Sequence, residues 1–89
     1  MSHFDAGTTL THASAKAALA AGLSRIAAGD TAVDCAALAQ FDSSALAVLL
    51  AWQRSAQARG ATLDIVNLPP KLASLAHAYG VDALIDGRH

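Results

Sequence analysis

Two adjacent hydroxyl side chains, Ser43 and Ser44, follow an acidic residue, Asp42, and stand directly before residues 45–52, which carry no polar side chain. Asp and Ser at such a position accept hydrogen bonds from the free backbone N–H groups of a helix, so Asp42 or Ser43 is predicted to cap one. The same hydroxyls could instead act as a nucleophile, a phosphorylation site or part of a docking surface. The positive end of the helix dipole would favour a phosphate group there, although beside Asp42 it would repel a docked partner.

Nucleophilic catalysis is the least favoured of these chemistries. The nucleophile elbow of hydrolases has the pattern G-x-S-x-G, whereas this segment is F-D-S-S-A. The chain has no run of glycines for an oxyanion hole, and the candidate bases are scattered histidines, two of them in the terminal segments: His3, His12, His77 and His89. We therefore predict no catalytic residue, and we expect His77 to lie on the outer side of a helix.

Metal, cofactor and nucleic-acid sites are not predicted either. No two histidines have a ligand-like spacing, and the single cysteine, Cys35, is expected to be a small buried core thiol. The six glycines form neither G-x-G-x-x-G nor a P-loop. The basic residues are dispersed and the net charge is −1, so there is no basic field for nucleic acid.

The order of predicted elements favours an α/β domain over residues 1–89. Short strands are expected at 8–11, 31–35 and 62–67, where β-branched residues occur between glycines and polar residues. Helices are expected from Ser14 to Gly29, from Asp42 or Ser43 to Gly60, and from Pro69-Pro70 to Gly80, with a last turn or strand at 81–85. This alternation predicts a small mixed sheet with parallel neighbours, flanked by three to four helices.

The helix that begins after Ser43 is apolar on every side until Trp52 and is expected to become polar from Gln53 onward. A helix with one buried face needs only a stripe of apolar residues, so the surplus is either a second buried face or an exposed patch for another protein. Functional residues of parallel α/β sheets collect where strands end and helices begin. Segment 41–47 lies at such a junction.

The apolar run is far shorter than the ~20 residues that cross a bilayer. No basic-then-apolar leader opens the chain. The single cysteine fits a reducing compartment. From these features we expect a soluble, cytoplasmic protein.

Residues Val33 to Ile85 resemble a STAS domain, the fold of sulfate-transporter tails and anti-sigma-factor antagonists. Val33-Asp34 matches the end of the family's strand, Phe41-Asp42-Ser43-Ser44 its acceptor loop, and the leucines at 46, 49 and 50 its helix. The resemblance implies that Ser43 matches the position phosphorylated in anti-sigma-factor antagonists and that Ser44 matches the following hydroxyl. The family opens with two strands, so the first strand here is expected to be missing or vestigial.

Two features depart from the antagonist branch of the family. Ala45 stands where glycine is usual, and "LASLAHAYGVDALI" is similar to the STAS subunit of the Gram-negative ABC transporter that traffics phospholipids and maintains outer-membrane lipid asymmetry. This similarity implies a non-enzymatic protein without cofactor that binds the transporter ATPase, two copies per transporter, at the cytoplasmic side of the inner membrane. The contact residues would be Phe41, Asp42, Ser43, Ser44, Leu46, Ala47 and Leu50. The alternative is an anti-sigma-factor antagonist whose partner is a kinase that phosphorylates Ser43.

Overall fold

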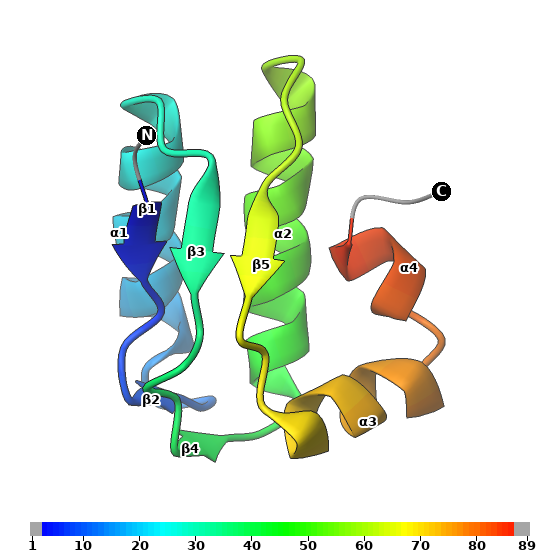
Figure 1. Cartoon of the computed structure of the whole chain (residues 1–89). Coiled ribbons are helices and arrows are strands. Elements are labelled where there is room, and N and C mark those ends of the chain that lie inside the picture. Colours follow the sequence, from blue (N-terminus) through cyan, green and yellow to red (C-terminus); the bar gives the residue numbers. More distant parts are fainter. Residues whose placement is uncertain (1–2, 87–89) are drawn as a thin grey trace.

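The computed structural model describes residues 3–86, which form five short strands and four helices (Figure 1). Strands and helices alternate along the chain, as the sequence predicts for an α/β fold. The strands are β1 (His3–Asp5), β2 (Thr9–Leu10), β3 (Ala32–Asp34), β4 (Gln40–Phe41) and β5 (Asp64–Val66), and the helices are α1 (Ala15–Ala27), α2 (Ser44–Ala58), α3 (Pro70–Ala78) and α4 (Asp82–Ile85).

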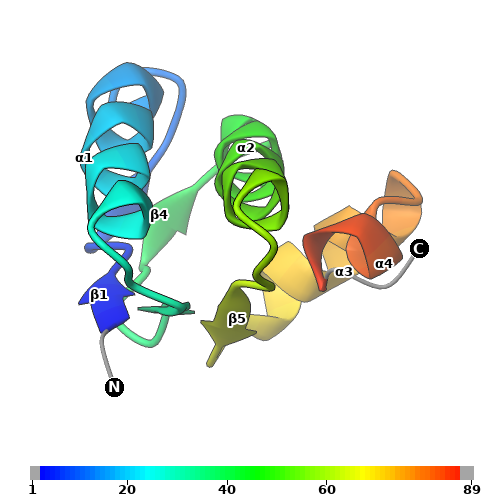
Figure 2. The same ribbon diagram turned by 90° about the horizontal axis from the view of Figure 1, so that it is seen from above.

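The central sheet has the order β1-β3-β5, and its register places Phe4 beside Val33 and Val33 beside Ile65. Successive side chains of a strand point to opposite faces, so these three share one face, which is covered by α1 and α2 (Figure 2). Phe4 and Val33 are buried and Ile65 is half-buried, whereas Asp5 and Asp64 are exposed on the opposite face. The sheet is therefore apolar on its helix side and polar on the other.

The strands differ from the expected mixed sheet. Every strand pairing among residues 3–86 is parallel, including the separate β2–β4 pair, so the sheet is not mixed. The first strand, expected to be missing or vestigial, is present as β1 and has only three residues. A single apolar residue, Phe4, between two polar ones is too short to give a strand pattern, and β1 is defined instead by its pairing with β3.

Trp52 of α2 packs directly against α1. Its indole N–H donates to the carbonyl oxygen of Leu19 at 3.2 Å, and its ring meets that of Phe4 edge-on with centroids 5.2 Å apart. A Cβ atom added at Gly22 would overlap the edge of the indole ring, so glycine is what allows the two helices to approach here. Trp52 is only 1% exposed, and it joins α1, α2 and the sheet in one core.

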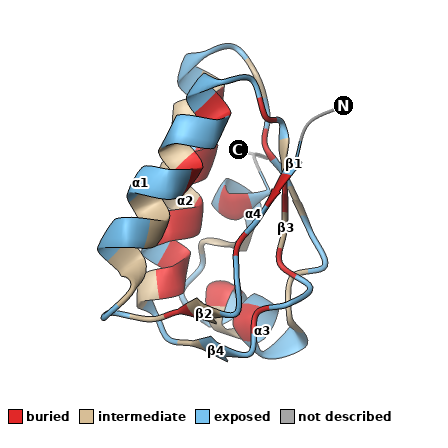
Figure 3. Ribbon diagram, turned by 90° about the vertical axis from the view of Figure 1, so that its left-hand side faces the viewer, coloured by how far each residue is buried: buried red, intermediate tan, exposed pale blue. Residues whose placement is uncertain are grey.

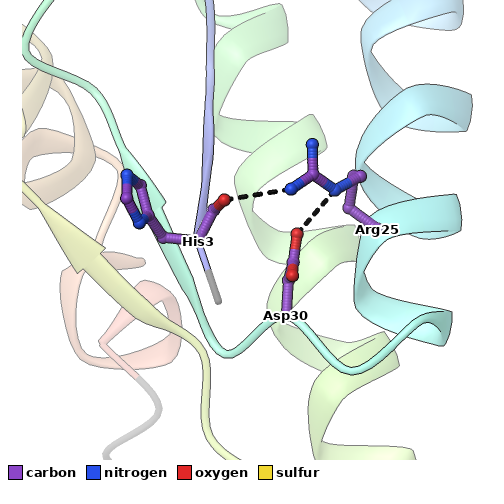
Figure 4. Close-up of polar contacts among 3 residues, drawn as sticks. All are labelled: His3, Arg25 and Asp30. Atoms are coloured by element: carbon purple, nitrogen blue, oxygen red, sulfur yellow. Dashed lines mark hydrogen bonds and ion pairs between the residues drawn. The ribbon is translucent and has the colours of Figure 1, made fainter. Parts of the chain in front are cut away.

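Arg25 ties the C-terminal end of α1 to the sheet (Figure 4). Its Nε forms a 2.7 Å ion pair with the buried carboxylate of Asp30, and its Nη2 donates to the carbonyl oxygen of His3 at 3.1 Å. The guanidinium thus joins the start of β1 to the turn that leads into β3. This contact helps to explain how so short a strand is held in place.

Gln53 begins the polar half of α2, yet it does not face solvent. The residue is 1% exposed, and its amide accepts from the Leu63 N–H at 2.8 Å and donates to the carbonyl oxygens of Leu63 and Ile85 at 2.7 Å each. Buried polar groups are tolerated when their hydrogen bonds are made. Gln53 therefore connects α2 to the segment before β5 and to α4.

The remaining boundaries agree closely with the sequence. The glycines at 29, 60 and 80 follow α1, α2 and α3 with positive φ, and Pro70 opens α3. Ser14 occupies the predicted N-cap position of α1, but its hydroxyl accepts from the N–H of Thr11, which precedes the helix. Tyr79, which falls at helical spacing with Leu72, Leu75 and Ala76, lies just after α3 ends and is 60% exposed.

The packing at Gly22 predicts that Gly22→Ala destabilises the protein, although alanine favours helices by about 1 kcal/mol over glycine. Overpacking costs about 1–3 kcal/mol, and the upper end applies because the overlapped ring is buried and hydrogen-bonded. We expect a net loss of about 2 kcal/mol in the free energy of unfolding, measured by urea denaturation. The loss should shrink in a Trp52→Phe background, where the overlapped ring edge is gone. A Gly22→Ala protein as stable as the parent would contradict the packing described.

Candidate functional site

The segment between β4 and α2 is held by the carboxylate of Asp42. Its Oδ1 accepts from the backbone N–H of Ser44 at 2.8 Å, at the start of α2. Its Oδ2 accepts from the backbone N–H of His12 at 3.0 Å, in the loop that leads into α1. Asp42 therefore caps α2, and it is one of the two residues that the sequence predicts for this role. It also connects the loop before α1 to the loop before α2.

Electrostatics at Asp42 follow from these two hydrogen bonds. They hold the pKa of Asp42 below its ordinary value, and the hydrogen bond from the His12 N–H contributes more than the one from the Ser44 N–H. Both donors favour the charged carboxylate. The loop therefore carries a negative charge at neutral pH, directly before the two serines.

Ser43 occupies the N-cap position of α2, yet its hydroxyl makes no capping hydrogen bond. The side chain is exposed, so its hydroxyl is accessible to a partner or to a modifying enzyme. Ser44 is half-buried and lines a hollow beside α1. The two serines thus differ. The Ser43 hydroxyl is open to solvent, whereas Ser44 lines the hollow between α1 and α2.

The predicted contact residues do not all reach the surface. Asp42, Ser43 and Ala47 are exposed, and Phe41, Ser44 and Leu50 are half-buried. Leu46 is 3% exposed and packs in the core, so its assignment to a contact edge is corrected. The reason is helical periodicity, because Leu46 lies three residues before the buried Leu49 and on the same face.

The apolar surplus of α2 therefore splits into two parts. Most of its residues are buried against the sheet and α1, and an outward strip remains that contains Ala47, Leu50 and Ala51. This strip borders an open groove of about 560 Å³, whose opposite wall is formed by Leu19 and Leu23 of α1. Figure 3 shows the same division, with buried residues on the sheet side of the helices.

The contribution of α1 to this surface was not foreseen. Leu19 and Leu23 belong to the apolar pattern that predicts the helix from Ser14 to Gly29, and both are half-buried. Their spacing of four residues correctly placed them on one helix face. No local pattern indicates that this face lies beside α2 and leaves part of each leucine open to solvent.

The cysteine and the histidines are the other residues that the sequence offers for chemistry. Cys35 is fully buried, and burial raises the pKa of its thiol to about 11, as expected for a core thiol. His77 is exposed on α3, as predicted, and its Nδ1 lies 3.1 Å from a carboxylate oxygen of Asp82. Residues 3–86 contain no group of three or more histidine, cysteine or acidic side chains that could hold a metal ion. His89 lies outside the described residues.

A parallel β1-β3-β5 sheet, covered on one face by α1 and α2 and carrying a hydroxyl-bearing loop at the start of α2, is the arrangement of a STAS domain. The family model described as "MlaB, STAS domain" matches residues 3–86, and the chain belongs to this family. Neither the curated proteins nor the solved structures give a significant match.

Family membership makes this chain an MlaB-type STAS domain, and STAS domains are generally binding modules without catalytic activity. None of the helices formed by residues 3–86 has the length and apolar character required to cross a bilayer. A candidate surface for another protein is therefore formed by the exposed Ser43, the charged Asp42 and the adjoining groove.

The depressed pKa of Asp42 predicts a pH-dependent cap. Its stabilising contribution is complete above the unfolded pKa of aspartate, about 3.9, and is lost as the pH falls through the lower folded value. Asp42→Asn should therefore be less stable than the parent near neutral pH, and the difference should narrow below about pH 4. Thermal unfolding across this range measures it. Asp64→Asn, an exposed aspartate on β5, is the matched control, and an equal pH dependence of both variants would contradict the role of Asp42.

Proposed function

We propose that this chain is the STAS subunit of an ABC transporter that traffics phospholipids between bacterial membranes and maintains outer-membrane lipid asymmetry. It binds the ATPase subunit of the transporter and supports its assembly and activity, without being an enzyme itself. The observation that carries the proposal is the MlaB-type family match over residues 3–86. The similarity of "LASLAHAYGVDALI" to the transporter subunit supports the same hypothesis.

The contact edge would be formed by the loop and the outward side of α2: Phe41, Asp42, Ser43, Ser44, Ala47 and Leu50. This edge combines an exposed hydroxyl, a carboxylate and half-buried apolar side chains on rigid elements. Such a mixture of an apolar centre and a polar rim is typical of protein interfaces. Binding to the ATPase would place the protein at the cytoplasmic side of the inner membrane, with two copies for the two ATPase subunits.

The proposal predicts that Ser43→Arg abolishes the complex with the ATPase subunit while the protein stays folded. The Ser43 side chain is exposed and does not cap α2, so arginine is accommodated in the free protein but obstructs a partner. Co-purification of tagged protein with the co-expressed ATPase measures binding, and circular dichroism measures folding. Thr62→Arg, at an exposed position after the opposite end of α2, is the matched control and should bind normally. Undiminished binding of Ser43→Arg would rule out this contact edge.

One observation favours the second candidate, an anti-sigma-factor antagonist switched by phosphorylation: the Ser43 hydroxyl is exposed and makes no capping hydrogen bond. This candidate predicts that incubation with a cognate anti-sigma kinase and ATP adds one phosphate to Ser43. Mass spectrometry of the intact protein and of its peptides would detect it, with Ser43→Ala as the control. Absence of phosphate on Ser43 and Ser44 with all candidate kinases would exclude the switch and leave the transporter role.

A further inference from the structure

A groove made of two adjoining hollows lies between the outer sides of α1 and α2. Its wider part, about 560 Å³, is lined by Leu19, Leu23, Ala47, Leu50, Ala51, Arg54 and Ser55. Toward the start of the two helices it continues into a hollow of about 300 Å³ lined by Ala15, Lys16, Leu19, Ser44, Ala47 and Val48. The two hollows share Leu19 and Ala47 in their linings and are together called the α1–α2 groove. It begins beside Ser44, within the contact edge proposed above.

The form of the groove suits a helix better than a small molecule. Small ligands occupy enclosed pockets that bury most of their surface. This groove is open, and its walls are two helices that run in the same direction (Figure 1). Its apolar side chains recur four residues apart, as Leu19 and Leu23 on one wall and Ala47 and Ala51 on the other. Such ridges accept the side chains of a third helix, and alanine allows its backbone to come close.

The charged residues of the groove indicate which kind of partner helix would fit it. Neither α1 nor α2 contains an acidic residue. Lys16 lines the groove at one end and Arg54 lines it farther along α2, and both are exposed. In the described part of the chain neither is in an ion pair, whereas Arg25 is already paired with Asp30. The positive dipole ends of both helices lie at the Lys16 end. The groove is therefore apolar along its floor and positive at two separate points.

The distance between Lys16 and Arg54 along the groove sets the separation of the acidic side chains expected on the partner helix. Lys16 lies level with Ser44, since both line the same hollow. Arg54 follows Ser44 by ten residues, which is about 15 Å along a helix. A partner helix lying in the groove would match both charges with acidic side chains about ten or eleven residues apart.

We propose that the α1–α2 groove receives an amphipathic helix of the ATPase subunit, with an apolar stripe between two acidic side chains that face Lys16 and Arg54. This inference rests on the proposed function and extends the edge at Ser43 along the helices. An anionic membrane surface is the competing occupant, and the experiment below separates the two.

The test is a charge reversal, Lys16→Glu combined with Arg54→Glu, in the full chain with the purified ATPase subunit. We expect the Kd to rise about thirtyfold at about 50 mM NaCl and the salt dependence of binding to fall, because two attractive pairs become repulsive. Lys71→Glu, an exposed lysine on α3, is the matched control and should bind like the parent. A photo-crosslinking residue at Leu50 should label a segment of the ATPase with apolar residues at helical spacing between two acidic ones.

Each outcome has a distinct meaning. Normal binding by the double variant, with loss of binding by Ser43→Arg, would overturn the groove and leave the proposed function standing. No binding of the parent protein to the ATPase would overturn both. Sedimentation with phosphatidylglycerol vesicles but not phosphatidylcholine vesicles, lost in the double variant while ATPase binding persists, would identify the membrane surface as the occupant and overturn the helix.

Discussion

The indole of Trp52 lies where α1, α2 and β1 meet, and most of the fold is organised around it. Its N–H reaches the Leu19 carbonyl oxygen, its ring meets Phe4 edge-on, and Gly22 leaves the space that it fills. In a chain with 23 alanines and only four aromatic residues, few side chains bury a large area. Close approach of small residues around one large ring compensates for this, because dispersion contacts depend on tight packing.

The placement of α1 against α2 has a direct consequence for the surface. Because Trp52 and its neighbours use the inner side of α2, Ala47, Leu50 and Ala51 remain on the outer side and form a groove with Leu19 of α1. Asp42 then fixes the same end of the molecule by binding the backbone of both entry loops. Ser43 is thereby exposed directly before Ser44, which lines the groove.

Much of this fold follows from local patterns, and the exceptions have identifiable causes. The capping role of Asp42, the glycines that follow three helices and the buried Cys35 were all predicted, since each depends on residue type and near neighbours. The strand β1 was not expected, because three residues carry too little pattern and their conformation depends on pairing with β3. The burial of Gln53 was not predicted, because nothing in its own helix indicates the backbone groups of Leu63 and Ile85 that it binds. The candidate site shows the same division: Ser43 and Leu46 were both predicted as contact residues, and Ser43 is exposed whereas Leu46 is buried.

The sequence by itself determined the order of the elements, the start of α2 at the two serines and the MlaB-type STAS family. These depend on caps, breakers and short-range spacing, which act within a few residues. Only the tertiary structure decided which residues of the apolar run 45–52 are buried, and that α1 supplies the second wall of the groove. Burial is a property of contacts between segments distant in the chain, so a helix that is apolar all round does not specify by itself which side faces the core.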